Sequence, residues 1–159
     1  MAIDMRNLLT GFSGQLISAQ SAALDVSTTD ASGTRLDLAA CVLREEDVLD
    51  VGFVVCNTPT GSTSYAVRFG KDKAGATAHS AAYYSSKVVD NTVSAGTVYR
   101  VSDGSLSWTG TADTETEREL TPGDIVTFTY LDTGDAAAAG TYVIPFAIMR
   151  PKEPLDPIA

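Results

Sequence analysis

The sequence predicts an all-β fold, an antiparallel β-sandwich or jelly roll of about eight strands. From Thr34 onward, apolar and polar residues alternate with a period of two in several runs, as they do on half-buried strands. Residues that favour turns separate these runs. The long helical segments that a βαβ fold would place between its strands are missing from the pattern. A length of 159 residues fits one domain with its own core.

The first alternating runs extend from Thr34 to Phe69. A charged turn at residues 44–47 follows the first run, and a polar turn at residues 57–62 follows the second. Each run places its apolar residues on one face, which is predicted to face the core. In chain order, these sets are Leu36, Leu38, Ala40 and Val42, then Val51, Phe53 and Val55, then Tyr65, Val67 and Phe69.

The middle of the chain contains a weaker strand pattern, at residues 82–89, and a strong hairpin signal. Asp103-Gly104 separates residues 97–101 from residues 106–108. Asp-Gly between two alternating runs predicts a tight hairpin, because both central residues of such a turn must tolerate a positive φ angle.

The last strands follow an acidic stretch at residues 113–119, which is predicted to be a solvated loop. A turn at residues 121–124 leads into a run rich in β-branched and aromatic residues, 125–131. Residues 132–140 are predicted to form a flexible loop. The final strand is predicted from the alternation of Tyr142, Ile144, Phe146 and Ile148. Because Pro145 has no N–H donor, this strand is expected at a sheet edge or with a bulge.

The two ends differ in pattern from the predicted sandwich domain, residues 27–149. Residues 1–26 are predicted to form an arm, extended or as a short helix: apolar residues recur at helical spacing, but Gly11 and Gly14 interrupt them. Residues 150–159 are rich in proline and are predicted to be extended. The apolar side chains of the arm need a partner, either the core of the domain or another chain, and the arm and the tail together are the predicted contact surface. Its candidate residues are Leu8, Leu9, Phe12, Leu16, Ile17, Pro151, Pro154 and Leu155. The alternative for both termini is fraying.

The chain is acidic, with a formal net charge of −9 and a pI of about 4.4. Its eleven basic residues are scattered. Binding to nucleic acid or to an anionic membrane requires clustered Lys and Arg, so neither partner is expected. The sequence has no run of eighteen apolar residues and does not begin with a signal-peptide pattern. The chain is therefore expected to stay in the cytoplasm or to join a particle assembled there.

The two cysteines, Cys41 and Cys56, leave two alternatives open. With the single histidine, His79, they fall short of the four ligands of a structural zinc site. The first alternative is a pair of buried, reduced thiols. The second is a cross-strand disulfide, which requires a hairpin centred near Val48. A shift of that centre by one residue would place the cysteines about 7–8 Å apart, beyond the reach of a disulfide.

The sequence predicts no enzyme activity and no cofactor. His79 lies among small residues, and the adjacent Ser80 would point to the opposite face of a strand. Nucleophile-elbow, phosphate-loop and dinucleotide motifs do not occur. Carboxylates concentrate in turns and loops, where solvation explains them. Asp132, Thr133 and Asp135 form the best local calcium cluster but lack the EF-hand pattern.

Trp108 and the Tyr83-Tyr84 pair raise a further alternative. An aromatic side chain that is exposed on a β-sandwich can stack against a sugar ring. Buried aromatics are more common, because Trp and Tyr are core and interface residues.

Four short motifs occur in order before Ala39: Arg6-Asn7-Leu8-Leu9, Ile17-Ser18-Ala19-Gln20-Ser21-Ala22, Ser27-Thr28-Thr29-Asp30 and Thr34-Arg35-Leu36-Asp37-Leu38. This order resembles the opening of the head decoration, or cement, proteins of short-tailed bacteriophages. The acidic loop at residues 113–119 and the proline-rich tail have no counterpart in the resemblance.

The resemblance implies a β-sandwich or jelly-roll protein, often trimeric, that binds the outer surface of a phage capsid. Such a protein bridges neighbouring major capsid proteins and needs no active site. Its partners would be the major capsid protein and further copies of itself. It would be made in the host cytoplasm and located on the virion surface. The alternative is a phage tail or fibre domain that binds host-surface glycans.

Overall fold

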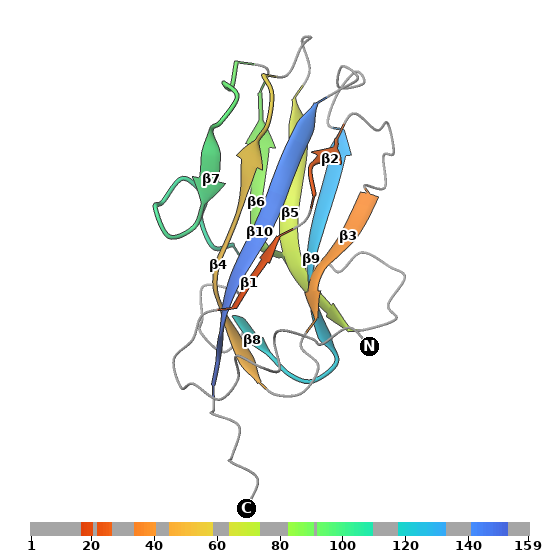
Figure 1. Ribbon diagram of the computed structural model, residues 1–159, viewed down its shortest axis with the longest axis vertical. Coiled ribbons are helices and arrows are strands. Elements are labelled where there is room, and N and C mark those ends of the chain that lie inside the picture. The colour runs from red at the N-terminus through yellow and green to blue at the C-terminus, as the bar shows by residue number, and fades with distance from the viewer. Residues whose placement is uncertain are drawn as a thin grey trace, which may run out of the picture.

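A computed structural model of the chain describes residues 17–20, 22–26, 34–40, 45–58, 64–73, 83–90, 92–109, 118–132 and 141–152. These residues form strands and turns, with no α-helix among them (Figure 1). The strands are β1 (Ile17–Gln20), β2 (Leu24–Asp25), β3 (Thr34–Ala40), β4 (Glu46–Val55), β5 (Tyr65–Lys73), β6 (Tyr83–Val89), β7 (Val98–Arg100), β8 (Glu119–Leu120), β9 (Asp124–Asp132) and β10 (Tyr142–Pro151). A search of these ranges finds no helix that could span a membrane.

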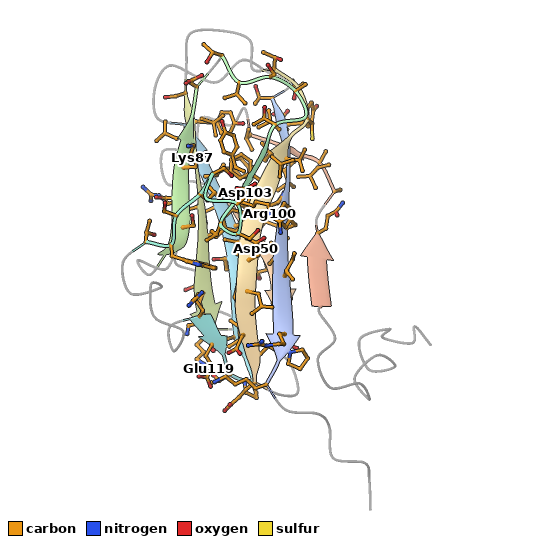
Figure 2. All side chains as sticks on the ribbon, turned by 90° about the vertical axis from the view of Figure 1, so that its left-hand side faces the viewer. Asp50, Lys87, Arg100, Asp103 and Glu119 are labelled. Carbon is orange, nitrogen blue, oxygen red and sulfur yellow. The ribbon has the colours of Figure 1, made fainter. Side chains whose placement is uncertain are left out.

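The strands form two antiparallel sheets that pack against each other, as predicted (Figures 1 and 2). Sheet A has the order β1-β10-β4-β7, with β2 also paired to β10 and β8 also paired to β4. Sheet B has the order β3-β9-β5-β6. The chain therefore crosses from one sheet to the other between consecutive strands such as β3 and β4.

The strand pairs are nested, which makes the sandwich a jelly roll. With β2 taken as a continuation of β1, and β8 set aside, eight strands remain. The first pairs with the last, the second with the seventh, the third with the sixth, and the fourth with the fifth. A long antiparallel hairpin that folds over on itself has this connectivity, and it divides the strands between two sheets.

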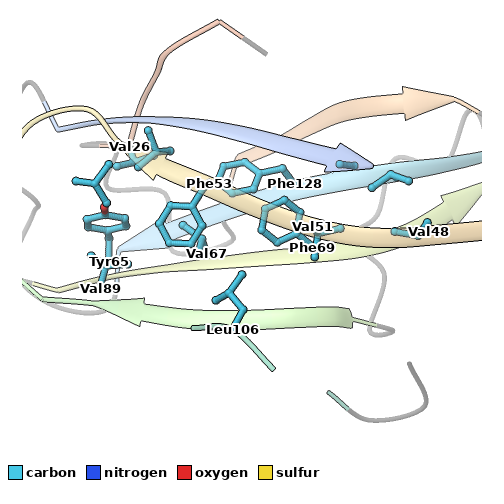
Figure 3. Packing of buried hydrophobic residues seen from close by; sticks show 14 of the residues in the cluster. Val26, Val48, Val51, Phe53, Tyr65, Val67, Phe69, Val89, Leu106 and Phe128 are labelled. Carbon is cyan, nitrogen blue, oxygen red and sulfur yellow. The ribbon is translucent and has the colours of Figure 1, made fainter. Parts of the chain in front are cut away.

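The core lies between the sheets and contains two of the predicted inward sets (Figure 3). Val51, Phe53, Val55, Tyr65, Val67 and Phe69 are each at most 1% exposed. The rings of Phe69 and Phe128 lie 5.1 Å apart in sheet B. Leu36 and Leu38 are half-buried and pack against the same cluster. Each large side chain buried in this way contributes about 1.5–3 kcal/mol, so the alternation that predicts the strands also stabilises the fold.

The hairpin centred near Val48 is wrong. Val48 is buried inside β4, and β4 pairs with β10 rather than with the preceding strand β3. The alternation of apolar residues specifies which face of a strand is buried but not which strand is its neighbour. Cys56 is a free, half-buried thiol, and burial raises its pKa. Cys41 lies outside the described residues.

The Asp-Gly signal marks a turn, but the predicted hairpin around it is wrong. Gly104 has a φ angle of 79°, and its N–H donates to the carbonyl of Val101 at 3.0 Å. Asp103 does not have a positive φ angle; its carboxylate accepts from the N–H of Ser105 at 2.9 Å. The following residues leave sheet A, and Trp108 forms a bridge to Ser85 in β6 of sheet B. The turn therefore connects the two sheets.

The final strand, β10, differs from its prediction in position, and the residues whose alternation predicts it are not its buried set. It is an inner strand of sheet A, between β1 and β4, so the predicted edge position is wrong. The alternative, a bulge, is present, but between Ile148 and Met149. Along one side of β10, β1 pairs with residues 146–149 and β2 pairs with residues 142–143. Pro145 lies in the gap between β1 and β2 and is therefore tolerated. Its buried neighbours on β10 are Val143, Ala147 and Met149.

The described end of the predicted arm is extended. Residues 17–20 form β1 and pair with β10, and Val26 is fully buried in the core. The helical alternative concerns mainly residues 1–16, which lie outside the described residues. The tail is described as far as Lys152, with Pro151 as the last residue of β10.

Tyr65→Phe is expected to leave the free energy of unfolding unchanged or to raise it by about 1 kcal/mol. Tyr65 is fully buried, and its hydroxyl has no hydrogen-bond partner within the described structure. Burial, and then the nearby Tyr99 and Cys56, raise the pKa of this phenol. The substitution removes a desolvated polar atom and keeps the packing of the ring.

Unfolding in guanidinium would measure this effect. Tyr65→Ala is the control and should lose about 3–5 kcal/mol, because it leaves a cavity. A loss above about 1 kcal/mol for Tyr65→Phe would mean that the hydroxyl has a partner after all.

Candidate interaction surfaces

The outer face of sheet A carries apolar side chains that point away from the core. On β10, the residues whose alternation predicts the strand lie on this outer face, and the buried residues lie between them. These outward residues are Tyr142, Ile144, Phe146 and Ile148. Outward-facing residues of β4 and β7 extend the surface. We call this surface the outer patch; its residues are Val54, Val98, Tyr142, Ile144, Phe146 and Ile148.

A row of three apolar residues crosses the outer patch from strand to strand. Ile144 pairs with Val54, and Val54 pairs with Val98, so the three side chains share one face. Val98 is 43% exposed and Tyr142 is 40% exposed, which places both among the most exposed large apolar residues of the described structure. The outer patch is therefore accessible to a partner at Val98, the end of this row, and at Tyr142.

Phe146 occupies the next row and lies against Gly52. A Cβ atom placed on Gly52 would lie 2.5 Å from Cζ of Phe146, so the ring fills the space that a larger residue would need. The guanidinium carbon of Arg100 lies 5.9 Å from the centroid of the same ring. This distance is at the limit of a cation–π contact.

Arg100 is held in place by Asp50, a buried carboxylate on β4 (Figure 2). Nε and Nη2 of Arg100 donate to Oδ2 of Asp50 at 2.9 and 2.5 Å. The backbone N–H groups of Val101 and Ser102 donate to its Oδ1 at 3.1 and 3.0 Å. The carboxylate therefore fixes β7 and the following turn to β4, and it neutralises the only charge beside Phe146 among the described contacts.

The end of sheet A near Met149 contains a charged hollow of about 210 Å³, which we call the basal hollow. Its walls are Asp47, Val48, Leu49, Arg118, Glu119, Arg150 and Lys152. Lys152 forms an ion pair with Glu119 at 2.5 Å, and Arg150 forms one with Asp47 at 3.3 Å. These groups are solvated, so the ion pairs stabilise the fold little.

The ion pairs agree with the directions of two pKa shifts. The hydrogen bond from Lys152 lowers the pKa of Glu119, and the same bond raises the pKa of Lys152. The predicted solvated loop at residues 113–119 is wrong for Glu119. It begins β8 and pairs with Asp47 of β4. The basal hollow is thus a structural contact between β4, β8 and the end of β10.

The predicted turn before β9 is confirmed. Gly123 has a φ angle of 91°, and the N–H and hydroxyl of Thr121 donate to Oδ2 of Asp124 at 2.8 and 2.9 Å. Asp124 also forms an ion pair with Lys73. Burial opposes ionisation of Asp124, but the hydrogen bonds from Lys73 and Thr121 outweigh it and lower the pKa. The Asp124 carboxylate therefore has a structural role in this turn.

Two of the predicted contact residues lie in the described structure, and both are on sheet A. Ile17 pairs with Met149 of β10, and Pro151 pairs with Glu46 of β4. The arm and the tail therefore attach at the same end of β10, beside the basal hollow. The other predicted contact residues lie outside the described ranges: Leu8, Leu9, Phe12, Leu16, Pro154 and Leu155.

The described residues offer no group of three His, Cys, Asp or Glu side chains that could hold a metal ion. His79, Thr133 and Asp135 lie outside these residues, and Asp132 ends β9.

Trp108 is half-buried and packs against the core, with the guanidinium of Arg118 4.9 Å from the ring centroid. One face of this ring is therefore occupied, which leaves less of it for a sugar.

The sequence-based contact surface did not include the outer patch. The sequence does contain a signal for it, because residues 142–149 are apolar at nearly every position. In a strand with one solvated face, apolar residues alternate with polar ones. An almost wholly apolar run instead predicts a strand that is covered on both faces. The core covers one face of β10, and the other face is the outer patch.

No family model and no curated protein matches the chain. Solved structures of viruses are similar to it, including the following three. A chain of the acidic stable capsid structure of Helicobacter pylori bacteriophage KHP30 has 12% identity and a TM-score of 0.44, with 87% of each chain covered. A chain of Desmodium yellow mottle tymovirus has 10% identity and a TM-score of 0.36, with 94% of this chain and 87% of that chain covered.

The third structure, of infectious bursal disease virus Gx strain, has 11% identity and a TM-score of 0.40. It covers 91% of this chain, which spans 35% of the viral chain. All three likenesses are too distant to assign a family.

Proposed function

We propose that this protein is a non-enzymatic structural component of a phage virion. It binds the outer surface of the capsid, bridges neighbouring major capsid proteins and so stabilises the head. It acts as an oligomer, with a trimer as the expected form. The observation that carries this proposal is a jelly roll that leaves one sheet face apolar and attaches both contact segments at one end of that sheet.

The fold and its chemistry support this role together. Jelly rolls serve in viral capsids, in lectins and in cupins, so the fold alone does not choose between them. A metal centre of the two-histidine, one-carboxylate type is excluded, because the sequence has a single histidine. The exposed apolar residues of the outer patch are typical of a protein–protein contact.

Binding to purified shells tests the proposal. The full chain is mixed with expanded capsids assembled from the major capsid protein of the same genome, and the shells are pelleted. We expect saturable co-sedimentation of the chain and a higher temperature of capsid disruption. A chain lacking residues 153–159 should bind more weakly, because the tail is part of the predicted contact surface.

Asp103→Asn is a matched control for this experiment. Asp103 lies in the exposed turn after β7 and is not part of the predicted contact surface, so this variant should bind as the full chain does. A chain that is strictly monomeric and does not co-sediment with expanded capsids would refute the proposed function.

A further inference from the structure

The outer patch is a surface without a partner in the described structure. Its central row of Ile144, Val54 and Val98 is apolar on three adjacent strands. Val98 and Tyr142 keep 43% and 40% of their surface exposed. Contiguous apolar surface of this kind is rare on a protein that remains alone, and it marks a contact site.

The chemistry of the outer patch selects an apolar and uncharged occupant. Arg100, beside Phe146, is already neutralised by two hydrogen bonds to Oδ2 of the buried Asp50. The other charged group at the patch, Asp25, pairs with Tyr142 and is an anion. An acidic or phosphate-bearing partner would therefore find no available cation at Arg100. A segment with large apolar side chains at short spacing would cover the row and pack against Phe146.

Residues 1–16 of the chain have these properties. They form the longest segment outside the described residues, and large apolar residues recur along them, including Leu8, Leu9, Phe12 and Leu16. The charges of Asp4 and Arg6 cancel. The segment joins the sandwich at Ile17, which pairs with Met149 on β10, the strand that carries most of the outer patch.

We propose that the outer patch of one copy binds residues 1–16 of a second copy of this chain. The direction of β1 favours a second copy over the same one. From Ile17 to Gln20, β1 runs from Met149 toward Phe146, so the chain before Ile17 leaves the sheet at the Met149 end. That direction points away from the row of Ile144, Val54 and Val98. Binding to its own patch would require the segment to reverse direction.

The segment is long enough to reach a neighbour. Sixteen extended residues span at most about 53–58 Å, which exceeds the size of a domain of this length. The contact joins two different surfaces and is therefore head-to-tail. Such contacts close into a ring when the rotation between copies allows it, which is compatible with the expected trimer.

This pairing rests on the role of the arm in the proposed function, but it is a contact between copies and not with the shell. The two can fail separately. A chain that pairs with itself but does not pellet with expanded capsids refutes capsid binding alone. A chain that pellets with capsids but does not exchange arms refutes the pairing alone.

Two variants of the full chain separate the arm from its binding surface. The first lacks residues 1–14 and keeps β1 and the outer patch. The second carries Val98→Lys and Tyr142→Lys, which place charges in the outer patch at its most exposed positions and keep the arm. Val88→Lys is the matched control: Val88 is 59% exposed, but it lies on β6 of sheet B.

Analytical ultracentrifugation of each protein, and of mixtures, measures association. We expect the full chain and the Val88→Lys control to self-associate equally. The truncated chain and the double variant should each associate at least about tenfold more weakly. A mixture of these two should recover a one-to-one complex, because one contributes the patch and the other the arm. Circular dichroism verifies that each variant is folded.

Three results would overturn the pairing. The first is a full chain that is monomeric. The second is a truncated chain or a double variant that associates as the full chain does. The third is a mixture of the two variants that stays monomeric although both are folded. A monomeric full chain together with a complex in the mixture would mean that the arm binds the patch of its own chain.

Discussion

Asp50→Asn is expected to lower the free energy of unfolding by about 3 kcal/mol. The side chain of Asp50 is 4% exposed and accepts four hydrogen bonds, two from Arg100 and two from backbone N–H groups. An asparagine replaces one acceptor oxygen with an NH₂ donor, which would face donors. It also leaves the Arg100 guanidinium without its counter-charge. Because Arg100 is 36% exposed, water limits the loss to the lower end of the range for a broken buried pair.

Urea unfolding at neutral pH, with the m value compared between variants, measures this loss. Asp103→Asn is the control, since Asp103 is an exposed carboxylate in the turn that Asp50 anchors, and its loss should stay below about 1 kcal/mol. Combining Asp50→Asn with Arg100→Met should cost less than the sum of the single losses. Additive losses, or a loss below about 1 kcal/mol for Asp50→Asn, would show that the carboxylate does not hold the turn.

The sequence predicts the faces of the strands better than their neighbours. The sets around Phe53 and Phe69 are buried as predicted, because in each run the face that carries the phenylalanine is the bulkier and more apolar one. The neighbour of a strand depends on the path of the chain. The pairing of β4 with β10 joins residues about a hundred positions apart in the sequence, and no local pattern encodes it.

β10 shows why even the buried face can escape prediction. Both of its faces are apolar, so its periodicity does not select one. The smaller set, which includes Ala147 and Pro145, fits against a core that already holds Phe53 and Phe128. The bulkier set, which includes Phe146, faces outward. Packing volume decides the orientation, and volume is a property of the assembled core.

The candidate site was predictable only in part. The sequence predicts the arm and the tail because their composition differs from that of a strand, and their role stays a prediction. Asp50 carried no signal, because it follows the acidic residues Glu45, Glu46 and Asp47 and has the appearance of a solvated position. Only its position across from β7 gives it four donors.

Gly52→Ala is expected to destabilise the fold by about 3 kcal/mol, the upper end of the usual cost of overpacking. A Cβ atom at this position would lie 2.4 Å from the carbonyl oxygen of Tyr99, 2.5 Å from Cζ of Phe146 and 2.9 Å from Cβ of Arg100. The Phe146 ring can move, but the carbonyl of Tyr99 belongs to the backbone of β7, which pairs with β4 here. Relief therefore requires β7 to shift away from sheet A.

Thermal and urea unfolding, compared with Gly96→Ala, separate this steric effect from the strain that alanine suffers in a turn. Gly96 has a φ angle of 83° and open space around its Cα, so its substitution should cost about 1 kcal/mol by backbone strain alone. In a chain that carries Phe146→Ala, the additional cost of Gly52→Ala should shrink but not vanish, because the contact with the Tyr99 carbonyl remains. An equal cost in both backgrounds would show that Phe146 does not lie on Gly52. In that case, the Phe146 ring of the outer patch would not be held in its outward position by β4.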